Sequence, residues 1–161
     1  MKQNEMAKYL KLITVTAGIL FLVFIGWFLP ATIKEEFIRN NTDNTTFYIV
    51  MISIWITAVP CYIALMEFYK ICCRIGNDNS FCAENAVGLK RMSVCMLIDS
   101  FAYIIFILIF FITGMNRIYQ LTGMVLFIVI MICIILTVIC AALSHLVEKA
   151  SHLQEEHDLT V

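Results

Sequence analysis

The sequence has few charged residues, few prolines and few glycines, and each shortage excludes a class of structure. Only 14% of its 161 residues are charged and 61% are hydrophobic, whereas a soluble domain is about a quarter charged and about half apolar. Two prolines and six glycines leave little of the chain for turns or coil. A net charge of −1 provides no basic surface for nucleic acid, so we expect no direct nucleic-acid partner.

Short motifs for catalysis and metal binding are absent as well. The chain contains no HExxH, GxSxG, Walker-type or GxGxxG pattern, and its apolar runs contain no histidine pair that would bind haem. His145, His152 and His157 fall near the end of the chain, where we expect exposed positions on a helix. We therefore predict that the protein is not an enzyme and has no catalytic residue, metal or cofactor.

Seven cysteines would suggest disulfides in a secreted protein, but their positions argue against that interpretation. Those inside apolar runs, where cysteine usually acts as a small hydrophobe, are Cys61, Cys95, Cys133 and Cys140. The others, in a stretch that we expect to face the reducing cytoplasm, are Cys72, Cys73 and Cys82. These three lack a second CxxC pair or a paired histidine, so we expect no zinc site.

Four apolar runs are long enough to cross a bilayer, which takes about 20 residues in a helix. We expect the spans at about residues 12–29, 46–66, 92–114 and 122–143. Pro30 is expected to end the first span and to leave a polar loop over residues 31–45, because proline lacks the N–H that continues a helix. The first run is too long for a signal peptide, so we expect it to be retained. The sequence thus predicts an all-α integral membrane four-helix bundle, in a single domain over residues 1–161.

Polar segments join and follow these runs. Residues 67–91 form a central connection, with a turn at residues 76–80 and helix on both sides of it. Residues 144–161 form a tail that we expect to leave the membrane as a helix. The start, the central connection and the tail hold eight of the 11 Lys and Arg residues, and the other three are Lys34, Arg39 and Arg117. The positive-inside rule then places both termini and the central connection in the cytoplasm.

Two of the apolar runs carry small or weakly polar residues at helical spacing, a pattern typical of closely packed membrane helices. In the second run these residues are Ser53, Thr57, Pro60 and Ala64. In the fourth run they are Cys133, Thr137, Cys140 and Ser144. We predict helix contacts along both stripes, and a kink at Pro60.

Asp99 lies about two turns inside the third apolar run, where a carboxylate costs about 2.5 kcal/mol or more to insert. Ser100 is adjacent, and Tyr103 is one turn further with a side chain that leans back toward Asp99. These three residues form a candidate intramembrane polar site. Three interpretations stay open: Asp99 is hydrated or paired with Lys70 or Arg91 near the inner interface, it latches two helices together, or it is a transport or sensing site.

Two sequence patterns resemble those of a known family. Phe81-Cys82-Ala83-Glu84-Asn85, followed by Leu89-Lys90-Arg91-Met92, resembles the F-[ST]-x-E-N…L-[KR]-[KR]-[IM] signature of the bacterial domain-of-unknown-function family 2975. The ending Asp158-Leu159-Thr160-Val161 is similar to that family's E-x-D-L-T-[VI] ending. Cys82 stands where the family has Ser or Thr. Because a thiol caps a helix poorly, we expect Asn79 or Ser80 to cap the next helix.

The resemblance implies a small four-span protein of the bacterial inner membrane with no assigned activity. Such proteins are commonly encoded beside a small helix-turn-helix regulator of the Cro/repressor type. The pairing implies a membrane protein that binds or signals to a transcription regulator, and both patterns fall on the side that we predict to be cytoplasmic.

We therefore expect a membrane-embedded regulatory protein that engages a cytoplasmic partner. The residues predicted to bind that partner are Glu84, Asn85, Lys90, Arg91, Asp158, Leu159 and Thr160. An equally open role for Glu84 and Asn85 is to pair with the tail and lock the inner face. The alternative functions are a small oligomeric transporter or channel that uses Asp99, and an immunity or receptor protein for a peptide toxin that uses residues 34–45 and 115–120. The bilayer is a partner in every case, and association of several copies is compatible with each.

Overall fold

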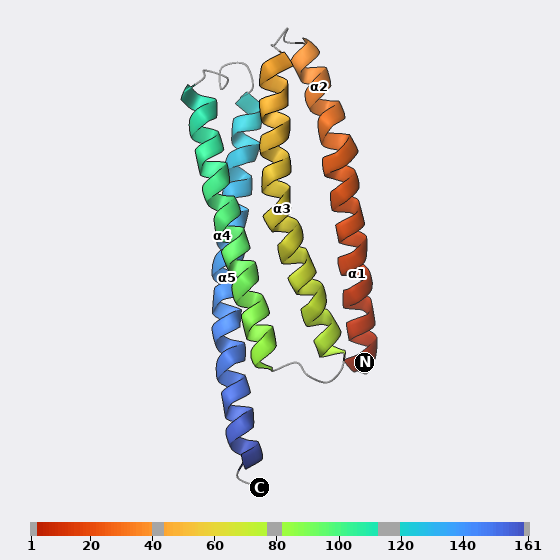
Figure 1. The fold of residues 1–161 in the computed structure, drawn as a ribbon, viewed down its shortest axis with the longest axis vertical. Helices are drawn as coiled ribbons and strands as arrows, with labels where there is room; N and C mark the ends of the chain where they lie inside the picture. Colours follow the sequence, from red (N-terminus) through yellow and green to blue (C-terminus); the bar gives the residue numbers. More distant parts are fainter. Residues whose placement is uncertain (1–2, 40–43, 77–81, 113–119, 160–161) are drawn as a thin grey trace.

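In the computed structural model, the described residues, 3–39, 44–76, 82–112 and 120–159, form four long helical rods joined by short segments (Figure 1). The first rod is continuous and combines α1 (Gln3–Val23), a π-helical turn η1 (Phe24–Phe28) and α2 (Leu29–Arg39). The others are α3 (Asn44–Ile75), α4 (Ala83–Ile112) and α5 (Gln120–Leu159). The predicted all-α fold is confirmed for this part of the chain.

Each rod contains a segment long and apolar enough to cross a membrane. These segments are Ala7–Arg39, Phe47–Ile75, Ala83–Ile112 and Gly123–Gln154. Only 11% to 17% of their most apolar stretches is buried inside the protein, so most apolar side chains point outward. Such a surface is unsuited to water but suits the hydrocarbon of a bilayer, as expected of a multi-pass membrane protein.

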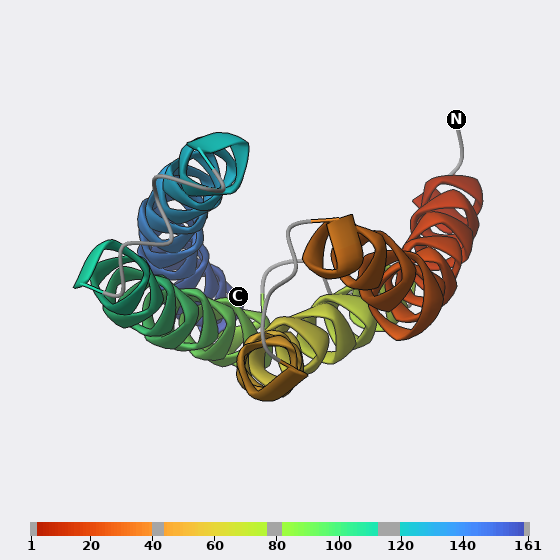
Figure 2. The same ribbon diagram turned by 90° about the horizontal axis from the view of Figure 1, so that it is seen from above.

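The four rods form an open, curved row. α4 packs against both α3 and α5, and α1 packs against α3. Within the described residues α1 and α5 do not touch, and Figure 2 shows them at opposite ends of the row. The bundle is therefore held by three successive helix pairs and is not closed into a ring.

The first helix does not end at Pro30, which corrects the predicted loop over residues 31–45. The N–H of Leu29 donates to the carbonyl of Phe24, five residues earlier, so the chain makes one wider π turn immediately before the proline. In an unbroken α-helix the ring of Pro30 would collide with the carbonyl of Gly26. The wider turn changes the local register, and the helix continues to Arg39 as α2.

Small residues lie where the rods approach each other, as the two stripes predicted. On α3, Thr57 and Ala64 are buried, and on α5 Cys133, Cys140 and Ser144 are buried. At the α1–α3 contact Gly18 leaves so little space that an added Cβ would lie 3.0 Å from Leu65 Cδ2.

Hydroxyl groups link these rods at three places. Ser93 Oγ on α4 donates to the carbonyl of Thr137 on α5 at 3.1 Å. Ser144 Oγ on α5 donates to the carbonyl of Ala86 on α4 at 2.8 Å. Between α1 and α3, Thr14 Oγ1 and Cys72 Sγ lie 3.9 Å apart. Each link places a small polar group against a neighbouring helix, away from lipid.

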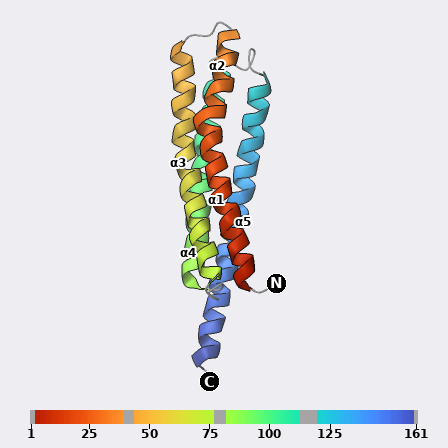
Figure 3. The ribbon, with the colours of Figure 1, turned by 90° about the vertical axis from the view of Figure 1, so that its right-hand side faces the viewer.

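The helices around the central connection follow the prediction. α3 runs without interruption through Pro60 to Ile75, and it changes direction near its middle in Figure 1. α4 begins at Ala83. Of the turn predicted at residues 76–80, Gly76 is a turn residue and residues 77–80 lie outside the described residues. α5 continues to Leu159 and projects beyond the ends of α3 and α4, as Figure 3 shows.

Candidate functional site

The first candidate site lies where α3 ends and α4 begins, and we call it the connection end. Arg74, near the end of α3, lies with its Nε 3.1 Å from Glu84 Oε2 on the first turn of α4. Its Nη1 donates to Asn85 Oδ1 at 3.4 Å. Asn85 is only 1% exposed. One arginine therefore binds both polar residues of the Glu84-Asn85 pattern, and it does so from the preceding helix.

The start of α4 explains how Glu84 and Asn85 reach Arg74. The carbonyl of Cys82 accepts hydrogen bonds from the N–H groups of Asn85 and Ala86 at 3.0 and 3.4 Å. Cys82 therefore occupies the capping position itself, while Asn79 and Ser80, which we expected to cap the helix, lie outside the described residues. The turn fixed by Cys82 directs Asn85 inward.

Glu67 is the second anchor of the connection end. It is 8% exposed, and its Oε1 lies 2.8 Å from Lys70 Nζ and 3.7 Å from Arg91 Nη1 on α4. Gly88 lies beside this group, because an added Cβ would come within 3.3 Å of Ile71 and 3.8 Å of Glu67. The close approach allowed by Gly88 brings the buried carboxylate within reach of Arg91, and the opposite charges offset the cost of burying it.

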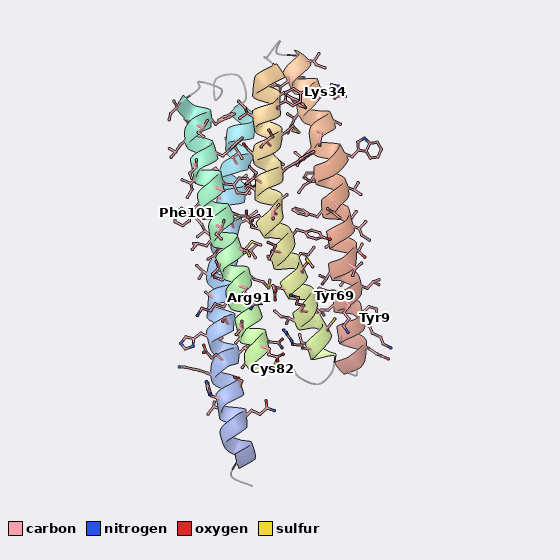
Figure 4. The ribbon with its side chains drawn as sticks, in the orientation of Figure 1. Tyr9, Lys34, Tyr69, Cys82, Arg91 and Phe101 are labelled. Atoms are coloured by element: carbon pink, nitrogen blue, oxygen red, sulfur yellow. The ribbon has the colours of Figure 1, made fainter. Side chains whose placement is uncertain are left out.

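The predicted partner-binding residues separate into two groups. Lys90 is exposed, and the side chains of Glu84 and Arg91 are 74% and 65% exposed. Asn85 is buried and holds α4 to α3. Figure 4 labels Cys82 and Arg91 on the part of α4 nearest the connection. The predicted residues of the tail, Asp158, Leu159 and Thr160, have side chains outside the described part of the structure.

The alternative role for Glu84 and Asn85 was a lock made with the tail. The structure shows both residues bound to Arg74 on α3, so they lock α4 to the preceding helix. The link between this region and α5 uses different groups, Ser144 Oγ and the carbonyl of Ala86. The described contacts of Glu84 and Asn85 therefore join α4 to α3, and the side chains of residues 155–161 of the tail lie outside the described part of the structure.

The second candidate site surrounds Asp99, at the junction of α3, α4 and α5. Asp99 is 2% exposed, and its Oδ1 has no hydrogen-bond partner among the described residues. It lies eight residues beyond Arg91, or about 12 Å along the helix axis. Lys70 and Arg91, the two cations considered as partners of Asp99, bind Glu67 instead.

Weakly polar side chains from three helices face this carboxyl. Cys61 on α3, Cys95 and Tyr103 on α4 and Cys133 on α5 all lie near Asp99. No hydrogen bond joins Tyr103 to Asp99 among the described residues, and the Tyr103 hydroxyl lies near Thr57 on α3. Ser100 is buried beside this group at 4% exposure. The three predicted site residues are therefore brought together with thiols that sequence reasoning did not assign to them.

The described residues form no metal site, and an apolar hollow lies among the helices. No group of three or more His, Cys, Asp or Glu side chains is placed to hold a metal ion in this part of the chain. His145 and His152 are exposed on α5. An apolar hollow of about 250 Å³ lies over α3 between α1 and α4, and is lined by residues that include Ala17, Leu65 and Met92. Its lining offers almost no polar atoms to orient a ligand, so it suits hydrocarbon chains.

Comparison with known proteins places the chain in a family. The family model described as a protein of unknown function (DUF2975) matches residues 31–161, which include the connection end, Asp99 and the whole of α5. The chain belongs to the DUF2975 family. No curated protein and no solved structure matches the chain significantly. The match confirms the resemblance seen in the sequence and assigns no activity to it.

Several residues that build these DUF2975 sites were not singled out from the sequence. Glu67 and Arg74 appeared only as charges in the central connection, although together they bind residues on the first turns of α4. A signal was present, since Glu67 is an acid directly after an apolar run and has a lysine three residues later. Nothing in the sequence indicated that Arg74 would bind Asn85 across the connection.

Proposed function

We propose that this DUF2975 protein is a membrane-embedded regulatory protein that binds a cytoplasmic partner through its connection end and the projecting part of α5, residues 144–159. The observation that carries the proposal is the exposure of Leu146 and Leu153, at 64% and 68%, on that projecting helix. Both lie beyond the fourth span expected at residues 122–143. They fall in the last part of the 32-residue apolar segment Gly123–Gln154, which is longer than the about 20 residues that a bilayer covers. Spaced seven residues apart, they lie on one helix face and suit a helical partner.

The charges near this helix support the same proposal. Lys90 and Arg91 are exposed at the connection end, and Arg91 is held in place by Glu67. A partner with an acidic surface would be attracted to these cations and would bury the leucines. A small helix-turn-helix regulator of a bacterial cell is a candidate partner, because family resemblance implies such a neighbour. In this proposal both termini face the cytoplasm of a bacterial inner membrane.

Capture from native membranes tests the proposal. Leu153→Asp places a charge in the proposed apolar contact, and Lys90→Glu reverses a charge at the connection end. His152→Asp is the matched control, because it adds the same carboxylate to an exposed neighbouring position of α5. We expect at least one soluble protein to be captured by the wild type and by His152→Asp, and to be lost from the other two variants. Identical capture by all four correctly folded proteins would show that this face does not bind the partner.

A second candidate function is a small transporter or channel, and the unpartnered carboxyl oxygen of Asp99 favours it. Buried ionisable groups in membrane helices commonly mark ion or substrate pathways. Purified protein in liposomes should then conduct protons or cations, and Asp99→Asn should abolish the flux. Equal flux in both proteins would remove this candidate. For the third candidate, an immunity or receptor protein for a peptide toxin, residues 40–43 and 113–119 lie outside the described structure, and no observation favours it.

A further inference from the structure

Two buried carboxyl groups in this protein have opposite surroundings. Glu67 is 8% exposed and lies within 3.7 Å of both Lys70 and Arg91. Asp99 is 2% exposed, and no cation lies beside it in the part of the chain that the structure describes. The contrast matters because a buried carboxylate must be paired with a cation, bind a ligand or carry a proton.

The groups around Asp99 decide among these three states. The facing titratable groups are Cys61 from α3, Cys95 and Tyr103 from α4, and Cys133 from α5. None of them carries a positive charge, and α1 does not pack against α4 within the described residues. Toward the connection end, Lys70 and Arg91 are both bound to Glu67. The carboxylate of Asp99 would therefore be uncompensated.

A bound metal ion does not fit these surroundings. The described His, Cys, Asp and Glu side chains include no group arranged to hold a metal. Hard cations such as Mg²⁺ and Ca²⁺ require about six or more oxygen ligands. The side-chain oxygens near this carboxyl are those of Ser100, Tyr103 and Thr57, which are too few for such a cation. A single proton needs only the carboxyl oxygen itself.

We infer that Asp99 is a proton-binding site enclosed by α3, α4 and α5 within the membrane. A proton on the carboxyl removes the charge without a partner, and the resulting O–H can donate a hydrogen bond. This site is independent of the proposed partner-binding face, because none of the residues around Asp99 belongs to that face. It also requires no transport, since a proton can bind from one side and leave to the same side.

Dicyclohexylcarbodiimide provides the test, because this apolar reagent enters membranes and consumes a protonated carboxyl. The acid proton moves to a carbodiimide nitrogen, while the carboxyl oxygen bonds to the central carbon. The O-acylisourea then rearranges to an N-acylurea by acyl transfer to nitrogen, and no group leaves. Wild-type protein in liposomes would be labelled over a pH series, and the modified residue would be identified by peptide mass spectrometry.

We expect labelling at Asp99 and none at Glu67, which is buried but paired with cations and serves as an internal control. Labelling should fall about tenfold for each pH unit once most of the carboxyl groups have lost their proton. Sodium chloride and potassium chloride at equal ionic strength should give equal labelling.

Three results would overturn the inference. The first is an unlabelled Asp99 at acidic pH in protein that elutes as a folded species, and the second is equal labelling of Asp99 and Glu67. The third is protection of Asp99 by sodium alone, which would assign the site to a monovalent metal cation. Asp99→Asn protein supplies the background, because it keeps the side-chain size and cannot react. A liposome flux measurement on the same samples separates proton binding from transport.

Discussion

Ser144 on α5 donates a hydrogen bond to the main-chain carbonyl of Ala86 on α4, at 2.8 Å, and both residues are buried. Ala86 follows the Glu84-Asn85 pattern directly, and Arg74 binds that pattern from α3. The first turn of α4 is therefore held from both sides, by α3 through charged groups and by α5 through a hydroxyl. This turn therefore connects α5 to the connection end.

Ser144→Ala should loosen the contact between α5 and the start of α4. Loss of a single buried hydrogen bond costs about 0.5–1.5 kcal/mol, so we expect a lower midpoint of thermal unfolding in detergent. Ser151→Ala is the matched control, because Ser151 is also buried on α5 but donates to the carbonyl of Glu148 in its own helix. An equal fall in the unfolding midpoint of both variants would show that the hydrogen bond to Ala86 stabilises the protein no more than a hydrogen bond within α5.

Replacing the two cations that bind Glu67 should destabilise the protein more than neutralising Glu67 itself. Lys70→Met with Arg91→Met leaves a buried carboxylate with only the more distant Arg74, whereas Glu67→Gln leaves two cations that can turn to water. Because Lys70 and Arg91 are about half or more exposed, we expect a loss of only about 1–3 kcal/mol for the double variant. Thermal unfolding in detergent measures both proteins. A lower midpoint for Glu67→Gln than for the double variant would contradict the assigned roles.

The helices themselves were predictable from the sequence, because apolar runs of sufficient length allow little else in a bilayer. All four expected spans lie within or largely within the observed helices. The error at Pro30 arose from treating proline as a helix terminator. The sequence rule ignores the π turn at Phe24–Phe28, which depends on the actual path of the carbonyl groups before the proline.

The candidate sites were less predictable than the helices. Asp99 stood out by composition alone, since a carboxylate in an apolar run is rare. Its thiol neighbours Cys61 and Cys133 come from two other helices, and a helical period identifies a face without identifying the helix that packs on it. The same limit applied to Arg74 and Asn85, which are eleven residues apart and meet only because the chain reverses direction between them.

Two glycines of the first rod should respond differently to the same substitution. Gly18 faces α3, where an added Cβ would already lie 3.0 Å from Leu65 Cδ2, whereas an added Cβ at Gly26 would meet nothing within 4 Å. Gly18→Leu should therefore push α1 away from α3 and reduce stability by about 1–3 kcal/mol, the usual cost of overpacking. Gly26→Leu should be tolerated, because its side chain would extend into lipid. Thermal unfolding in detergent and crosslinking between cysteines placed on α1 and α3 would distinguish the two variants, and equal behaviour would contradict the observed packing.

Asp99→Asn should change the pH dependence of stability. In alkaline solution the wild type must bury an unpaired carboxylate or open the α3–α4–α5 junction, while the neutral amide carries no such charge. The variant should then unfold at a higher temperature than the wild type at pH 9. The difference should shrink toward pH 5, because the wild-type carboxyl gains a proton there. A difference between the two proteins that is constant across this range would mean that the Asp99 carboxyl is ionised in the folded protein as it is in the unfolded chain, and would contradict a bound proton.

The orientation of the row in the membrane can be tested by labelling single cysteines in a variant that lacks the seven native thiols, all of which are free in this structure. A cysteine at Asn77 reports on the connection between α3 and α4, and one at Asn41 reports on the opposite side of the membrane. If the positive-inside rule holds, an impermeant maleimide added to intact cells should modify the probe at Asn41 and spare the probe at Asn77. Disrupting the cells should make both probes reactive. The reverse pattern in intact cells would place Lys90, Arg91 and the projecting part of α5 outside the cytoplasm, where a soluble intracellular regulator has no access to them.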